Sequence, residues 1–76
     1  MIEVFKTNVQ DRAIAADIVE MIHAVGMGYR ANFDLEDCDR ILRVAGALIV
    51  DNQMVIRIVR SFGCEAYPLE DVPAFS

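Results

Sequence analysis

Apolar and polar residues follow two different periods along this chain, and the changes of period divide it into six elements. Residues 1–9 contain Val, Ile and Phe without a helix cap, which is typical of a strand. After a polar segment, apolar residues recur at three- and four-residue steps as far as Gly26 and Gly28, which predicts an amphipathic helix. The buried stripe of this helix would consist of Ile14, Ile18, Met21, Ile22 and Val25.

From residue 29 the period changes to two, which is the period of a strand with one buried face. The apolar positions of this strand are Tyr29, Ala31, Phe33 and Leu35. A polar, acidic break at 36–39 separates it from a second β-rich run at 40–44. The two runs therefore predict a hairpin with an acidic tip.

A second helical pattern and a last short strand complete the chain. Asp51 is the expected N-cap of this helix, and Gly63 is expected to end it in a left-handed conformation. Its apolar stripe contains Met54, Val55, Ile58, Val59 and Phe62. Residues 64–69 read as a strand, and Pro68 favours a place at the edge of a sheet.

The order strand, helix, strand, strand, helix, strand predicts a fold class. Two βαβ crossovers around a hairpin give an α+β, ferredoxin-like βαββαβ sandwich, with two helices on one face of a four-stranded antiparallel sheet. A chain of 76 residues forms a single domain, here 1–76, in which 71–76 would be a short C-terminal tail.

Charge and composition limit the classes of partner that the chain is expected to bind. The net charge is −5 and the arginines are scattered, so the chain lacks the basic surface that binds nucleic acid. No apolar stretch approaches the roughly 20 residues of a membrane span, and no leader pattern is visible, so we expect a cytoplasmic protein. Cys38 and Cys64 form no C-x-x-C motif and are expected to be free thiols.

Several motifs occur in a fixed order along the chain. Ile18 and Ile22 follow Ile14 by four and eight residues, and "GYRANFDLEDCDRILRV" has the form of a G-V-x-x-x-x-V-D-L hairpin. An I-x-x-A-I-x-x-x-G pattern is matched by Val55, Ile58, Val59 and Gly63. In these features nearly the whole chain resembles the heavy-metal-associated domain family, the fold of copper chaperones and of the N-terminal modules of metal-transporting P-type ATPases.

The chain departs from that family in the loop where the family binds metal. Alignment on the aliphatic stripe places Asp11 and Ile14 at the two cysteines of the G-M-T-C-x-x-C loop, and Lys6 where an inward aliphatic is usual. The carboxylate of Asp11 is a hard ligand, and Ile14 has no lone pair to offer. Neither side chain therefore replaces the thiolates that bind soft copper or zinc in that family. The resemblance therefore implies a degenerate metal-binding loop and a non-catalytic domain without a resident metal, acting through protein contact or self-association.

Two alternatives remain for the chemistry. A soft-metal carrier could bind Cu(I) or Zn(II) through Cys38, Cys64 and Asp11, because the three connections that hold them project from one end of this topology. An acylphosphatase-like hydrolase could use Arg12 and Asn32, although the loop before Arg12 lacks the glycines that cradle a phosphate. We expect no enzyme activity.

Two other polar features are expected to be exposed. The acidic tip lacks the alternating spacing and glycine of a calcium loop, and we expect a solvated turn. Its members are Glu36, Asp37 and Asp39. The single histidine, His23, lies near the end of the first helix, where we expect an exposed residue of a type favoured near a helix C-terminus rather than a ligand or a base.

The open face of the sheet is the predicted contact surface for a homodimer or another protein. With strand order 4-1-3-2 and with Tyr29, Phe33, Leu42 and Val44 buried, an apolar set would point outward on three adjacent strands. This set consists of Phe5, Ile41, Tyr67 and Leu69. Leu48 and Ile49, before the second helix, are further apolar residues without an evident place in the core.

Overall fold

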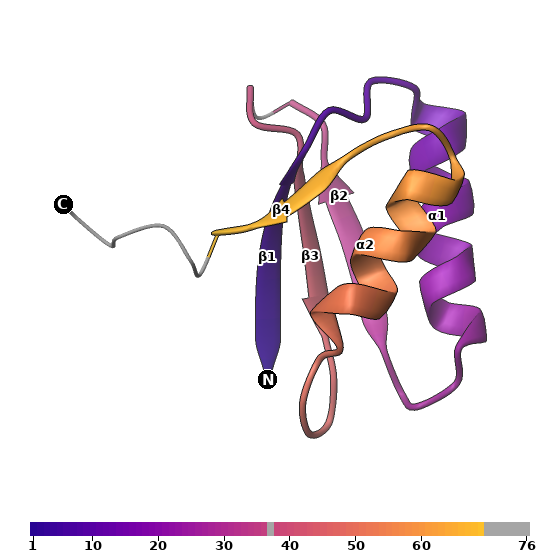
Figure 1. The fold of residues 1–76 in the computed structure, drawn as a ribbon, viewed down its shortest axis with the longest axis vertical. Helices are drawn as coiled ribbons and strands as arrows, with labels where there is room; N and C mark the ends of the chain where they lie inside the picture. Colours follow the sequence, from indigo (N-terminus) through magenta and orange to yellow (C-terminus); the bar gives the residue numbers. More distant parts are fainter. Residues whose placement is uncertain (37, 70–76) are drawn as a thin grey trace, which may run out of the picture.

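The six predicted elements are present in the predicted order in the computed structural model, which describes residues 1–36 and 38–69. They are β1 (Ile2–Thr7), α1 (Arg12–Ala24), β2 (Arg30–Asp34), β3 (Ile41–Ala45), α2 (Asn52–Ser61) and β4 (Ala66–Pro68). The strands form one antiparallel sheet in the order β2-β3-β1-β4, and both helices lie on the same side of it (Figure 1). The α+β ferredoxin-like fold is thus confirmed, while the tail 71–76 lies outside the described residues.

Both helices begin at an aspartate that caps their free backbone amides. The Oδ1 of Asp11 accepts a hydrogen bond from the Ala13 N–H at 2.8 Å, and Asp51 accepts one from the Met54 N–H at 3.2 Å. After α2 the chain turns at Gly63, whose φ of +80° suits a residue without a Cβ. The predicted cap and turn at Asp51 and Gly63 are therefore confirmed. No helix in the described part of the chain is long and apolar enough to cross a membrane.

The core lies between the helices and the covered face of the sheet. Both helical stripes contribute fully buried aliphatic side chains, and β1 and β3 supply the opposing layer. The prediction was wrong for Met21 and Val25 of the first stripe, which are 48% and 43% exposed because they lie at the rim of the helix packing. The largest fully buried side chains are Phe5, Val9, Ile18, Ile22, Leu42, Val44, Val55 and Val59. α1 packs mainly over β2 and α2 mainly over β4. Within residues 1–36 and 38–69, no helix lies against the opposite face of the sheet (Figure 1).

The pairing register corrects the prediction that Phe5 points outward. Phe5 lies opposite Leu42 on β3, and directly paired antiparallel residues point to the same face, so Phe5 is in the core with 0% exposure. Lys6 takes the outward position instead, although the family alignment put it where an inward aliphatic is usual. The alternation in β1 is ambiguous because Ile2 and Val4 share the outward face with Lys6.

Candidate functional site

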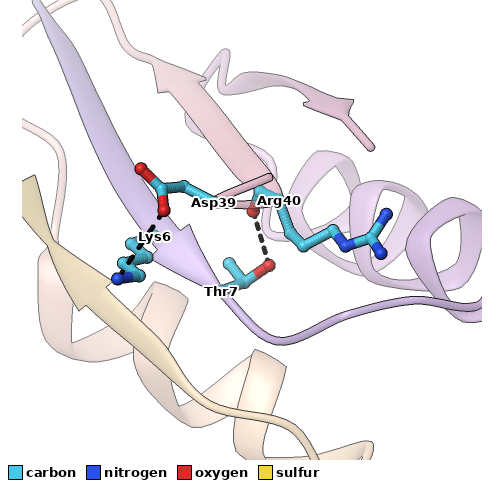
Figure 2. A network of polar contacts seen from close by, with 4 residues as sticks. All are labelled: Lys6, Thr7, Asp39 and Arg40. Carbon is cyan, nitrogen blue, oxygen red and sulfur yellow. Dashed lines mark hydrogen bonds and ion pairs between the residues drawn. The ribbon is translucent and has the colours of Figure 1, made fainter. Parts of the chain in front are cut away.

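The β1–α1 loop, which holds the metal in the family that the chain resembles, is fixed by hydrogen bonds. The Thr7 hydroxyl donates to the Arg40 carbonyl at 2.6 Å (Figure 2) and accepts a hydrogen bond from the Val9 N–H at 3.3 Å. On the other side, the Asn8 side-chain oxygen accepts from the Glu65 N–H at 2.8 Å. The loop is thereby tied both to the β2–β3 connection and to the α2–β4 connection.

The two positions that would carry the metal-binding thiolates have other surroundings. The Asp11 carboxylate is exposed and is engaged as the cap of α1. Ile14 is half-buried and packs against the core. Neither side chain offers a soft ligand, and both have a role in holding α1 in place.

The two cysteines are free thiols in different environments. Cys38 is exposed in the β2–β3 connection, whereas Cys64 is half-buried against the core with its Sγ 3.8 Å from the Phe62 carbonyl oxygen. Their connections lie at the same end of the domain but on opposite sides of it (Figure 1). Among residues 1–36 and 38–69, no three His, Cys, Asp or Glu side chains are grouped as metal ligands, so Cys38, Cys64 and Asp11 are not assembled into such a set.

The acidic tip of the hairpin is joined to β1 by a surface ion pair. Asp39 Oδ1 lies 3.6 Å from Lys6 Nζ (Figure 2), and both side chains are about half exposed. Glu36 is exposed, and Asp37 lies outside the described residues. A pair this exposed contributes roughly 0–1 kcal/mol to stability.

The acylphosphatase-like alternative depends on two residues that lie in different surroundings, Arg12 and Asn32. Arg12 lines a hollow together with Asp34, Glu36 and Arg43. Asn32 is on the open face of β2, opposite Arg43. The hollow thus holds two arginines and two carboxylates, so it has no excess of positive charge for a phosphate.

His23 has a contact that the sequence did not reveal. It is exposed at the end of α1, as predicted, and its Nε2 accepts a hydrogen bond from the Ala31 N–H at 3.1 Å. Ala31 lies in β2, which is an edge strand of the sheet. No sequence pattern links residues 23 and 31, because the contact depends on how the end of α1 packs beside the edge.

The open face of the sheet carries a mixed surface rather than the predicted apolar patch. Ile41 and Tyr67 both point to this face, but Lys6 lies between them in the register. Tyr67 is 58% exposed, while Ile41 is only 6% exposed and Leu69 is half-buried. With Phe5 in the core, the four predicted residues do not form one exposed apolar surface.

Exposed apolar side chains gather at one end of the domain. Among the described residues, six of the eight large hydrophobic side chains that are exposed lie at the start of the chain or in two nearby connections. We call these six the apolar end: Met1, Ile2, Val25, Met27, Leu48 and Ile49. The start of the chain, the α1–β2 connection and the β3–α2 connection lie together at this end, opposite the β1–α1 loop (Figure 1).

Tyr29 holds the β3–α2 connection of the apolar end in place. Its hydroxyl donates to the Ile49 carbonyl at 3.4 Å and accepts from the Asp51 N–H at 3.3 Å. The ring packs on Gly46 so closely that an added Cβ would lie 3.0 Å from ring atom Cε1. Because the Gly46 N–H also donates to the Met1 carbonyl at 2.8 Å, the β3–α2 connection is held beside the start of β1.

Comparisons with known proteins identify no relative of this chain. No protein-family model, curated protein or solved structure matches it. The resemblance to heavy-metal-associated domains therefore stays a prediction from motifs. The function must be inferred from the arrangement of the side chains.

Part of the apolar end was visible in the sequence. Leu48 and Ile49 stood out as apolar residues between two elements, outside any periodic stripe. Met27, placed between two glycines, carried the same signal and was missed. That these residues lie at the same end of the domain could not be predicted, because they come from different connections.

Proposed function

We propose that this chain is a small non-catalytic domain, similar to heavy-metal-associated domains but without the two-thiolate loop, that acts by binding another protein through the apolar end. The observation that carries the proposal is the exposure of apolar groups at one end of the domain, at 83% for Leu48, 74% for Met27 and 73% for Ile49. Contiguous exposed apolar surface is a mark of protein interaction sites.

The partner surface is expected to be an apolar recess in a folded protein. Unbranched methionine and projecting leucine side chains adapt to irregular recesses and become buried there, where most binding energy is concentrated. The net charge of −5 disfavours nucleic acid and an anionic lipid surface as alternatives. A recess lined by aliphatic or aromatic side chains fits the apolar end best.

Site-specific photo-cross-linking followed by reconstitution tests this proposal. A photoreactive residue at Met27 should capture one defined polypeptide that the same residue at Arg57, exposed on α2, does not capture. With that polypeptide purified, Leu48→Asp combined with Ile49→Asp should weaken binding at least about ten-fold, and Arg57→Asp should leave it unchanged. Equal capture from both positions, or unchanged affinity, would contradict the proposal.

Metal titration separates the proposal from the soft-metal alternative. Purified protein should show close to zero stoichiometric binding of Cu(I) or Zn(II) in the presence of a weak competing chelator, because the family's two thiolates are absent. Tight one-to-one binding that is lost on Cys38→Ser or Cys64→Ser would overturn the proposal and favour a metal carrier.

A further inference from the structure

The outer edge of β2 presents backbone groups that another strand could pair with. In an antiparallel sheet, the N–H and C=O groups of alternate residues point to opposite sides of a strand. The Ala31 N–H points away from β3, since it donates to His23. The backbone groups of Phe33, two residues further on, therefore point to the same outer edge.

The side chains on the open face of β2 carry an unmatched pair of charges. Arg30 and Asp34 stand at the two ends of this strand and point to the same face as Asn32 between them. Their directly paired residues on β3, Ala45 and Ile41, are uncharged, and Arg43 lies between these two, opposite Asn32. Within the described part of the chain, neither Arg30 nor Asp34 forms an ion pair.

We propose that two copies of this chain pair through their β2 edges, antiparallel, with a two-fold axis at Asn32. The sequence Arg-Ala-Asn-Phe-Asp is self-complementary in this register, because Arg30 of each copy faces Asp34 of the other. Opposite charges directly across two strands stabilise their pairing, and the symmetry provides this contact on both sides of the axis.

The same register satisfies the backbone. Ala31 of one copy lies opposite Phe33 of the other, and both residues direct their N–H and C=O groups outward. Each such pair exchanges two hydrogen bonds, as in any hydrogen-bonded pair of an antiparallel sheet. The N–H and C=O groups of Asn32 point inward, to β3. A shift by one residue would place Asn32 opposite a residue of the second copy whose N–H and C=O groups point outward, and these would find no partner. The register with the axis at Asn32 is therefore favoured over the two registers next to it.

Side chains on the helix side of β2 leave room for the second strand. A hollow of about 400 Å³ lies between α1 and β2. Its lining includes three alanines, and the full set is Ala15, Ala16, Val19, Glu20, Ala31, Asn32 and Phe33. In the proposed pairing the Phe33 ring of the second copy lies opposite Ala31, next to this hollow. A large side chain thus meets a small one on each side of the axis.

His23 competes with the second copy for the Ala31 N–H. Its imidazole occupies that N–H in the single chain, and the Phe33 carbonyl of the second copy would replace it. The His23 side chain is exposed, so it can rotate into solvent without leaving a buried gap. Removing the imidazole by His23→Ala should therefore strengthen the dimer.

Charge reversal tests the pairing by sedimentation velocity over a concentration series. Arg30→Asp gives a chain with acids at both ends of β2, and Asp34→Arg gives one with bases at both ends. Each variant alone should dimerise at least about ten-fold more weakly than the unchanged chain, and an equimolar mixture should recover the dimer as a heterodimer. Arg57→Asp is the matched control and should dimerise like the unchanged chain.

A disulfide tests the position of the axis. Facing residues of a non-hydrogen-bonded pair have Cα atoms about 4.5 Å apart, within the range of a disulfide. In a background of Cys38→Ser and Cys64→Ser, Asn32→Cys should oxidise to a covalent dimer, whereas Arg30→Cys should not.

The inference goes beyond the proposed function, since it uses β2 rather than the apolar end. A chain that is monomeric at every concentration, or a dimer unaffected by both charge reversals, would overturn it. Loss of the dimer on combining Leu48→Asp with Ile49→Asp would also overturn it, and would assign self-association to the apolar end. A dimer unchanged by those two substitutions supports the β2 pairing.

Discussion

The Nε2 of His23 lies 3.1 Å from the Ala31 backbone nitrogen and accepts its hydrogen bond, so a helix side chain covers one point of the sheet edge. Unpaired edge strands invite association with other strands. His23 therefore limits how much of β2 is open in the single chain.

Replacing His23 by alanine should expose that point of the edge. We expect the Ala31 amide proton to exchange faster with solvent, and the free energy of unfolding to fall by about 0.5–1.5 kcal/mol, the value of one hydrogen bond. Hydrogen exchange followed by NMR, at a concentration where the chain is monomeric, measures the first effect. His23→Gln keeps an acceptor oxygen, so its exchange rate at Ala31 and its free energy of unfolding should lie between those of the unchanged chain and of His23→Ala. Unchanged exchange at Ala31 would mean that the contact does not form in solution.

Substitutions at Phe5 and Lys6 should differ sharply although the residues are adjacent. Phe5→Ala removes a fully buried ring and should lower the free energy of unfolding by about 3–5 kcal/mol. Lys6→Ala removes only an exposed partner of Asp39 and should change it by less than about 1 kcal/mol. Urea denaturation of both variants decides the register, and the opposite order of effects would show that β1 faces the other way.

The hydroxyl of Thr7 should matter more than its methyl group. Thr7→Val keeps the shape but leaves the buried Val9 N–H without its acceptor and the Arg40 carbonyl without its donor. We expect a loss of about 1–3 kcal/mol in the free energy of unfolding. Thr7→Ser retains the hydroxyl and should lose clearly less, and equal losses for the two variants would assign the effect to packing.

The close approach of Gly46 to Tyr29 predicts a coupled pair. Gly46→Ala brings a Cβ to 3.0 Å from the ring and should lower the free energy of unfolding by about 1–3 kcal/mol through overpacking. In a Tyr29→Leu background the ring is absent, so the same substitution should be tolerated better. Denaturation of the two single variants and the double variant gives the coupling energy, and strict additivity would argue against this contact.

Local periodicity was enough to predict the elements of this domain. The stripe through Ile18 and Ile22 and the cap at Asp51 are set by residues close in sequence, and each is present as predicted. The element order then allowed few topologies, and the ferredoxin-like arrangement followed. The sequence predicted only part of the candidate site. Leu48 and Ile49 stood out as apolar residues between two elements. The three ligands of the soft-metal alternative, Cys38, Cys64 and Asp11, are not grouped as metal ligands in the structure.

Residue types at short spacing were enough to predict the helices, the strands and their order, and the same local reading shows that the chain contains no C-x-x-C motif. Tertiary structure alone decided that Phe5 is inward and Lys6 outward, since apolar residues occur at both parities of β1 and only the pairing with Leu42 selects a face. It also decided that His23 meets Ala31, because strand pairing and helix packing join residues that no local pattern connects.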